Sequence, residues 1–326
     1  MTDTSTSANA QNFLADVGEF GVIARITDGV TYSPRVLIGP GDDAALVSTE
    51  RETLISVDVM VEGRHFRRDW SSAMDVGRRA AAASLADIAA MGGVATAIVV
   101  GFSAPEDLPA AWAAQCAAGL REECGLVGAE VVGGDVTAAP VICVSVTAIG
   151  HAERVVTRSQ AQPGDVVAVC GRLGWAAAGL AILGRGFRAP KVLVDAHRFP
   201  QIDYTAGPRA AAAQASSLID VSDGVIADAR HVAQSSGVQI HLRTADVTID
   251  EPVADAASAY SLDPLEWVLT GGDDHAFLAT FPPGATIPDG FRVIGEVREG
   301  ETSGVWVNGH HITSVGGHEH FGKTRA

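Results

Sequence analysis

Short hydrophobic runs bounded by glycine, proline and polar residues recur along the first half of the chain and predict β-strands. The clearest runs are residues 53–59, 94–102, 129–134 and 141–150. Two alanine-rich segments of helical spacing lie among these runs and stop at glycine, a common helix terminator: residues 73–93 and 106–125. Strands interleaved with helices predict an α/β fold with mixed sheets.

The polar segment 159–165, which contains a Pro-Gly pair, interrupts this pattern and marks the expected boundary between two domains. A second series follows, with a strand at 165–171, a helix at 175–186, an alanine-rich helix near 207–217, a strand-to-helix passage at 218–237 and a helix-to-strand passage at 264–281. We therefore expect a disordered N-terminus (1–12), an N-terminal domain (13–152) and a C-terminal α/β domain (153–326).

Composition and charge narrow the range of partners. The chain has 326 residues, 47% of them hydrophobic, which is enough for two domains with cores of their own. Its formal net charge of -16 argues against nucleic acid or an anionic membrane surface as a partner. Lys191 and Lys323 are the only lysines. A phosphate-bearing ligand would therefore need cations brought in from solution.

Cysteine usage and the N-terminal sequence bear on the compartment. Four cysteines stand singly in apolar surroundings without C-x-x-C spacing, which favours reduced thiols over a zinc site or a disulfide framework. The first residues are polar and lack the apolar stretch of a signal peptide, and no window is long and apolar enough to span a membrane. We expect a cytoplasmic protein.

Two segments fit the consensus sequence of a phosphate-binding motif but lack the structural surroundings that the motif needs. Residues 317–324, GHEHFGKT, fit the P-loop pattern, but too few residues follow them to form the helix whose N-terminus would bind phosphate. Residues 39–44, GPGDDA, fit a dinucleotide-binding loop after a strand. There, Asp42 and Asp43 would repel a pyrophosphate unless a metal ion stood between them.

Aspartates recur in one sequence setting, beside glycine or in an apolar run. They are Asp42, Asp43, Asp58, Asp87, Asp135, Asp220, Asp223, Asp273 and Asp274. Most have an ordinary structural interpretation, because aspartate before glycine forms turns and Asp223 could cap a helix. Asp87 is harder to explain this way, since its surroundings are almost wholly apolar and a carboxylate there must be paired, protonated or metal-bound.

The shared setting favours a metal centre. If the strands are neighbours, acids at their ends converge on one edge of a sheet, where open α/β folds bind ligands. A dense set of oxygen ligands suits Mg²⁺, which binds carboxylates together with water and substrate phosphates. We therefore interpret the acids as metal ligands and the metals as the groups that hold phosphates.

A series of motifs in fixed order carries a family resemblance: GDDAAL, SVDVMVEGRHF, LADIAAMGG, VVGGDVT, RVVTRSQAQPGD, IDVSDGV and TGGDDH. The series resembles the thiamine-monophosphate kinase family, of the aminoimidazole-ribonucleotide-synthetase-like superfamily, over nearly the whole chain. The resemblance implies a two-domain α/β kinase that uses ATP and Mg²⁺ to convert thiamine phosphate to thiamine diphosphate. It also implies a homodimer formed through the N-terminal sheet.

Carried over motif by motif, the resemblance assigns roles to individual residues. The implied Mg²⁺ ligands are Asp43, Ser56, Val57, Asp58, Asp87, Asp135, Asp220 and Asp223. The implied ATP contacts are Gly134, Asp135, Arg158 and Ser222. The implied thiamine phosphate contacts are His65, Asp273 and His318. A valine can ligate a metal only through its backbone carbonyl.

The chain departs from the family pattern at three places. The family usually has serine where Ala86 stands, Glu-Asp-Tyr where this chain has Asp273, Asp274 and His275, and an aromatic residue at His318. Asp273 is one methylene shorter than glutamate, and a histidine offers less stacking area than tyrosine or tryptophan. Both of these changes fall on the expected substrate side.

Phosphoryl transfer needs positioning and charge neutralisation more than a protein nucleophile, so we expect direct in-line transfer without a covalent enzyme intermediate. Three alternatives stay open at this stage. The chain could be another ATP-using member of the superfamily, a two-metal phosphohydrolase that uses the same acids, or a metal or nucleotide sensor without turnover. Formation of an ATP-dependent product separates the kinase from the last two.

Overall fold

The computed structural model describes residues 13–38, 46–48 and 52–313, which form two compact units. The first unit comprises Met1–Ser48, Val57–Ala81 and Ala97–Thr147, and the second comprises Thr49–Ser56, Ala82–Thr96 and Ala148–Ala326. The expected disorder at 1–12 lies outside the described residues. The domain limits at residues 152 and 153 stay a prediction.

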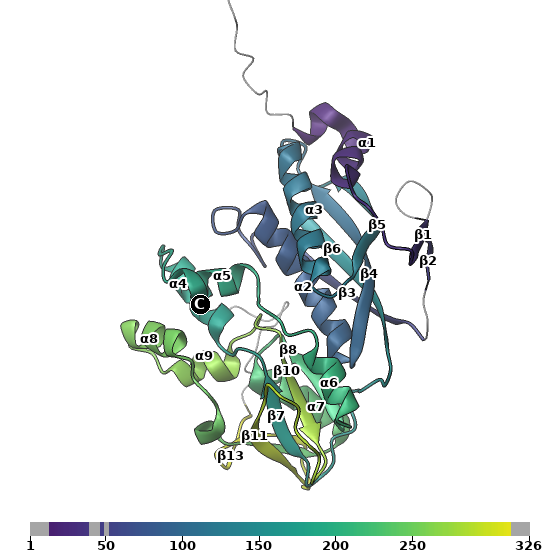
Figure 1. The fold of residues 1–326 in the computed structure, drawn as a ribbon. Coiled ribbons are helices and arrows are strands. Elements are labelled where there is room, and N and C mark those ends of the chain that lie inside the picture. The colour runs from purple at the N-terminus through teal and green to yellow at the C-terminus, as the bar shows by residue number, and fades with distance from the viewer. Residues whose placement is uncertain (1–12, 39–45, 49–51, 314–326) are drawn as a thin grey trace, which may run out of the picture. The chain divides into compact units, whose positions relative to one another are not determined.

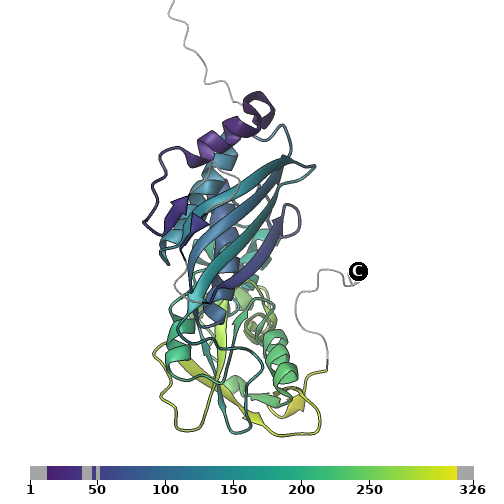
Figure 2. The same cartoon turned by 90° about the vertical axis from the view of Figure 1, so that its right-hand side faces the viewer.

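The N-terminal half of the chain forms a four-stranded sheet with helices on one face (Figures 1 and 2). Its elements are α1 (Leu14–Thr27), β1 (Val36–Ile38), β2 (Leu46–Val47), β3 (Leu54–Val61), α2 (Ala73–Ala90), β4 (Gly93–Ala104), α3 (Ala110–Gly125), β5 (Glu130–Ala138) and β6 (Cys143–Ala152). The strand order is β3-β6-β4-β5, with β4 and β5 parallel, while β1 and β2 form a separate antiparallel pair.

Helices α2 and α3 approach each other backbone to backbone. A Cβ atom on Gly77 would lie 1.9 Å from the carbonyl oxygen of Cys116, and one on Gly119 would lie 2.1 Å from that of Met74. Larger residues at either glycine would push the helices apart. The small residues of these alanine-rich segments therefore serve close helix packing, which holds α2, the helix that carries Asp87.

Strand β3 separates polar from apolar side chains by simple alternation. Ser56 and Asp58 are half-buried on one face, whereas Ile55, Val57 and Val59 are exposed on the other, at 68%, 59% and 48%. Successive side chains of a strand point to opposite faces, so this separation follows from the sequence alone.

The expectation that the acids stand at strand ends is wrong for two of them. Asp58 lies inside β3 and Asp135 lies inside β5, whereas Asp87 is on helix α2, as its helical segment predicted. Flanking glycines suggested strand ends, but the strands continue through them: Gly134 is inside β5, where a Cβ atom would lie 2.1 Å from the carbonyl oxygen of Val100 on β4. That glycine serves close strand packing.

The C-terminal half of the chain forms a seven-stranded sheet with helices packed around it (Figure 1). Its elements are β7 (Val166–Cys170), α4 (Trp175–Gly184), α5 (Lys191–Arg198), α6 (Ala206–Ala212), β8 (Ser217–Val221), α7 (Val225–Ser236), β9 (Gln239–Leu242), the 3₁₀ helix η1 (Thr244–Asp246), α8 (Glu251–Ala259), α9 (Pro264–Thr270), β10 (Ala276–Phe281), β11 (Phe291–Arg298), β12 (Gly304–Val307) and β13 (His310–His311).

The strand order of this sheet is β13-β12-β9-β11-β7-β10-β8. Its pairs are antiparallel except for the parallel pair of β12 with β9. The fully buried β10 packs Phe277 and Phe281 into the core. Two mixed sheets with packed helices confirm the predicted α/β fold class.

One predicted helix is shorter than its pattern indicated. The alanine-rich segment near 207–217 is helical only as far as Ala212, and β8 begins at Ser217. Gln214 adopts a positive φ of 61°, which helical residues cannot have, and the Ser217 N–H donates to Thr280 Oγ1 of β10. Pairing with a distant strand therefore overrides the local helical preference of alanine. No described helix is long and apolar enough to cross a membrane.

Candidate functional site

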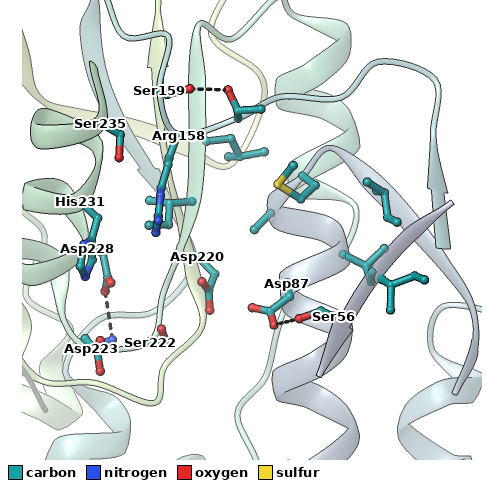
Figure 3. Close-up of a pocket in the computed structure, with 18 residues that line it drawn as sticks. Ser56, Asp87, Arg158, Ser159, Asp220, Ser222, Asp223, Asp228, His231 and Ser235 are labelled. Atoms are coloured by element: carbon teal, nitrogen blue, oxygen red, sulfur yellow. Dashed lines mark hydrogen bonds between the residues drawn. The ribbon is translucent and has the colours of Figure 1, made fainter. Parts of the chain in front are cut away.

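The second unit contains a cavity of about 630 Å³ that is lined by both polar and apolar side chains (Figure 3). The lining comes from the start of β3, the end of α2, residues 157–159, β8 and α7. Its hydrophobic part includes Leu54, Ile88, Met91, Leu218 and Ile219. Its main polar and charged residues are Ser56, Asp87, Arg158, Ser159, Asp220, Ser222, Asp223, Asp228, His231 and Ser235.

Asp87 reaches the cavity from an otherwise buried turn of α2. Its neighbours Ala86 and Ile88 are fully buried, while Asp87 is half-buried and accepts a hydrogen bond from the hydroxyl of Ser56 (Figure 3). The apolar residues around Asp87 are therefore the buried residues of α2, whereas the carboxylate itself contacts a polar side chain. Two residues predicted separately from the sequence, Ser56 and Asp87, are direct partners.

Asp220, near the end of β8, is buried beside a histidine. Its Oδ2 lies 3.0 Å from Nδ1 of His275, and both side chains are about nine-tenths buried. Burial alone would lower the pKa of His275, but the hydrogen bond and charge of Asp220, helped by Asp273 and Asp87, raise that pKa to about 9. The second unit therefore places a histidine ring against a predicted metal ligand.

The turn between β8 and α7 gathers a second group of acids. Asp228, on the first turn of α7, is buried and accepts hydrogen bonds of 3.0 Å from the backbone N–H groups of Asp223 and Gly224 (Figure 3). Burial and the charge of Asp220 raise the pKa of Asp228 to about 8. Ligand atoms of Asp223, Asp228 and His231 lie within 4.8 Å of one another, so this turn could hold a divalent cation.

Arg158 brings positive charge to the same cavity. It is exposed and extends into the cavity, and its carbonyl oxygen accepts a hydrogen bond from the Ser236 hydroxyl, which fixes the backbone of its loop to α7. Ser222, at the turn after β8, also lines the cavity. The geometry therefore brings together Ser56, Asp87, Arg158, Asp220, Ser222 and Asp223 from the predicted set.

The other predicted residues lie elsewhere. Val57, Asp58, His65, Gly134 and Asp135 belong to the first unit. His65 follows β3, and its Nδ1 accepts a hydrogen bond of 2.9 Å from the Val61 N–H, so a neutral ring carries its proton on Nε2. Asp43 and His318, like the P-loop-like segment 317–324, lie outside the described residues.

The turn 271–275 gives its three polar residues different surroundings. Both carboxylate oxygens of Asp274 accept N–H bonds at the start of α4, from Gly174 and Ala176, and Asp274 is 6% exposed. Asp273 is half-buried with a positive φ of 66°, and its N–H donates to the Ser222 carbonyl at 2.8 Å. Asp274 is therefore a helix-start acceptor, whereas Asp273 is held beside the turn that carries Ser222.

Sequence reasoning missed Asp228, His231 and the partner role of His275. A local signal existed for the first two: Asp228 and His231 are three residues apart on α7, a spacing that places side chains on one helix face. No comparable signal existed for His275, whose partner Asp220 is distant in sequence.

The arrangement suits a metal-assisted reaction of phosphates. Carboxylate oxygens are the ligands that Mg²⁺ and Mn²⁺ prefer, and an arginine can bind phosphate oxygens through two N–H groups. Neither cysteine nor lysine is among the described residues that line the cavity. The lining therefore favours electrostatic catalysis over covalent catalysis by either of these nucleophiles.

Comparison with known proteins agrees with this chemistry. The family of the AIR synthase related protein, N-terminal domain, matches residues 41–152. The thiamine-monophosphate kinase of Mycobacterium tuberculosis (strain ATCC 25618 / H37Rv) is 46% identical over 314 residues, which cover 95% of this chain and 93% of that protein.

Similarity extends to a more distant organism and to a solved complex. The thiamine-monophosphate kinase of Aquifex aeolicus (strain VF5) is 33% identical over 311 residues, which cover 93% of this chain and 98% of that protein. The solved structure of AaThiL complexed with AMPPCP and TMP matches with a TM-score of 0.79 at 32% identity, over 96% of this chain and 100% of that one.

Proposed function

This chain belongs to the thiamine-monophosphate kinase family, and from that premise we propose that it transfers the terminal phosphoryl group of ATP to thiamine phosphate. The family resemblance seen in the motifs is confirmed by relatives that match nearly the full chain. The observation that carries the proposal is the match to AaThiL, which was solved with an ATP analogue, AMPPCP, and with TMP. The products are ADP and thiamine diphosphate.

Mg²⁺ fits the residues of the cavity. Asp87, Asp220, Asp223 and Asp228 offer oxygen ligands, and the charge of Asp220 contributes to the raised pKa of Asp228. Carboxylates crowded in this way repel one another, and a bound divalent cation relieves that repulsion. When bound, Mg²⁺ supplies neutralisation of phosphate charge.

We assign the ligand roles as the motifs implied them. Within the second unit, Ser56, Asp87, Asp220 and Asp223 hold Mg²⁺, and Arg158 and Ser222 bind the phosphates of ATP. Their shared position in one cavity supports this assignment. Asp43, the Val57 carbonyl, Asp58 and Asp135 complete the proposed ligand set, and Gly134 with Asp135 contacts ATP.

The reaction needs no covalent intermediate with the protein. A phosphate oxygen of thiamine phosphate attacks the γ-phosphorus of ATP, and the bond from that phosphorus to the oxygen bridging it to the β-phosphate breaks. Both reactants are anions, so their approach in line is the main electrostatic obstacle. Arg158 lowers that obstacle because its guanidinium brings positive charge and can bind phosphate oxygens through two N–H groups.

His65, Asp273 and His318 contact thiamine phosphate in this proposal. For His65, the Val61 N–H at Nδ1 supports the role, because a neutral ring then carries its proton on Nε2 and is a hydrogen-bond donor there. For Asp273, support comes from its bond to the carbonyl of Ser222, a proposed ATP contact. His318 rests on the motif alone.

We further propose a homodimer formed through the N-terminal sheet. The outer face of β3 exposes Ile55, Val57 and Val59, a row of large apolar side chains on one strand, and the helices cover the other face of the sheet (Figure 2). Solvated sheet faces usually carry polar residues.

A cytoplasmic location also stays a prediction, based on cysteine usage.

Incubation of the purified protein with ATP, Mg²⁺ and thiamine phosphate tests the activity. The proposal requires one thiamine diphosphate for each ADP, with the label of γ-³²P-ATP in the terminal phosphate of the product and none on the protein. Release of free phosphate without thiamine diphosphate would identify a phosphohydrolase. Labelled protein would contradict direct transfer.

A further inference from the structure

The hydrogen bond between His275 and Asp220 restricts the orientation of the Asp220 carboxylate. His275 Nδ1 donates to Oδ2 of Asp220 at 3.0 Å, and the same carboxylate lines the cavity. The ring of His275 thus holds one oxygen of Asp220, a residue whose side chain lies in the cavity lining (Figure 3). A carboxylate held at one oxygen cannot rotate freely about its Cβ–Cγ bond.

The backbone fixes His275 in place. Its N–H donates to the Val221 carbonyl at 3.0 Å, and the next residue, Ala276, pairs with Val221 as β10 meets β8. The residue is 7% exposed and adopts a positive φ of 50°, which non-glycine residues seldom do. A backbone in a sparsely populated conformation persists where its surroundings determine it, and such residues cluster at functional sites.

We propose that His275 is a positioning residue that orients Asp220 for divalent-cation binding, an inference that rests on the proposed function. Ligating carboxylates are generally held by a further hydrogen bond, and loss of that bond typically costs about 10- to 100-fold in metal affinity or activity. The family motif usually has tyrosine at the position of His275, so the motif by itself did not indicate this role.

The surrounding charges agree with the geometry. The negative charges of Asp220, Asp273 and Asp87 act on the His275 ring, so the ring lies within the field of the acids that the cavity gathers. A hydrogen bond donated to one carboxylate oxygen fixes the orientation of the group, while the other oxygen can bind a cation. Among the described residues, His275 is the only side chain that forms a hydrogen bond with Asp220.

The test compares two variants of nearly equal shape. His275→Asn keeps an N–H donor close to the position of Nδ1, and His275→Leu fills a similar volume without any donor. Mn²⁺, which shares the ligand preference of Mg²⁺, is titrated alone into each protein, and the electron paramagnetic resonance signal of the free ion gives the Kd. This readout needs neither nucleotide nor turnover.

We expect His275→Leu to weaken Mn²⁺ binding about 10-fold or more, and His275→Asn to retain most of the affinity. Wild-type affinity in folded His275→Leu would overturn the proposal, as would equal losses in both variants. If His275→Leu does not fold, His275→Phe keeps a ring of similar size without the donor and is judged by the same two outcomes.

His197→Leu is the matched control. His197 is a buried histidine of α5 in the same unit, 5% exposed, and it does not line the cavity. Its replacement should lower the unfolding temperature and leave the Mn²⁺ affinity unchanged. A loss of affinity in this control equal to that of His275→Leu would assign the effect to general destabilisation and overturn the proposal.

The proposed function and this inference fail separately. If the wild-type protein makes thiamine diphosphate while His275→Leu binds Mn²⁺ normally, only the positioning role is wrong. If the wild-type protein binds Mn²⁺ but makes no thiamine diphosphate, the kinase proposal is wrong, and the affinities of the variants still decide whether His275 positions Asp220.

Discussion

Strand β3 and the turn 271–275 both carry predicted site residues, but the two regions place them by different means. In β3, alternation alone puts Ser56 and Asp58 on one face and the apolar residues on the other. In the turn, Asp273, Asp274 and His275 are consecutive, yet the backbone N–H of Asp273 contacts Ser222, while the side chains of Asp274 and His275 contact the start of α4 and Asp220.

A residue's position in a motif fixes the direction of its side chain in a regular strand, but not in a turn. A regular strand fixes the direction of each side chain, so a role assigned to one position implies the face of its neighbours. In the turn, positive φ angles at Asp273 and His275 break that regularity, and each residue's contact depends on a partner that is distant in sequence. Similar residues in a turn therefore need not share a role.

The largest expected effect comes from Asp87, the partner of Ser56 on the polar face of β3. Asp87→Asn keeps an acceptor for the Ser56 hydroxyl and removes the charge, so the protein should stay folded. Turnover should fall by on the order of 10²-fold or more, the scale of one lost preorganised electrostatic contact, with a higher Mg²⁺ requirement. The measurements are turnover against Mg²⁺ concentration, with circular dichroism to confirm folding.

Asp75→Asn is the control for this substitution on the same helix. Asp75 accepts the Ser72 N–H at 2.9 Å at the start of α2, away from the cavity. Its replacement should leave turnover unchanged. Near-wild-type activity and Mg²⁺ dependence in folded Asp87→Asn would make Asp87 a satisfied structural residue and shrink the proposed metal centre.

The apolar face of β3 offers the next largest effect. If the sheet forms a homodimer, Val59→Lys places an unpaired charge in the interface from each subunit, which costs roughly 3 kcal/mol or more. We expect a monomer by sedimentation equilibrium at concentrations where the wild-type protein is dimeric. Leu126→Lys, at another exposed apolar position (62% exposed), should leave the dimer intact. A dimeric Val59→Lys protein would exclude this face.

Asp274→Ala tests whether the role of Asp274 is structural, through its hydrogen bonds to the start of α4. It removes two hydrogen bonds to the start of α4, and bonds to a charged acceptor contribute about 1.5–3 kcal/mol each. The free energy of unfolding in urea should drop by roughly 3–6 kcal/mol, with the KM values of the folded enzyme little changed. A stable variant with a raised KM for thiamine phosphate would instead assign Asp274 to the substrate.

Asp273→Glu tests the proposed contact of Asp273 with thiamine phosphate, and its expected effect is smaller. The extra methylene should shift the KM for thiamine phosphate severalfold and barely touch that for ATP, because only one subsite is altered. Glutamate tolerates the left-handed backbone of Asp273 less well than aspartate, so the unfolding temperature is measured in parallel. Equal shifts in both KM values would remove Asp273 from the substrate side.

The smallest expected effect is at Lys323, in the P-loop-like segment. If metal ions and Arg158 hold the phosphates, Lys323→Ala should leave the KM for ATP nearly unchanged. A P-loop lysine contacts the β- and γ-phosphates directly, so its loss would raise that KM steeply. A rise on the order of 100-fold would mean that this segment binds nucleotide after all.

The sequence by itself determined the fold class, the family and the face of each β3 residue, because strand period, helix-ending glycines and motif order are local properties. It also singled out Asp87, since a charge in an apolar helix stands out without any structure. It placed Asp58 and Asp135 wrongly at strand ends, because glycine beside an acid is typical of turns and also of close strand packing.

Only the tertiary structure decided which acids meet and what each one contacts. Asp220 and His275 are 55 residues apart, Ser56 and Asp87 are 31 apart, and Asp274 reaches α4 from about 100 residues away. Such partners are joined by strand pairing and by the packing of helices on sheets, which depend on the whole chain. The sequence specifies the chemical groups, and long-range packing selects the pairs among which a metal ion and two phosphates could be held.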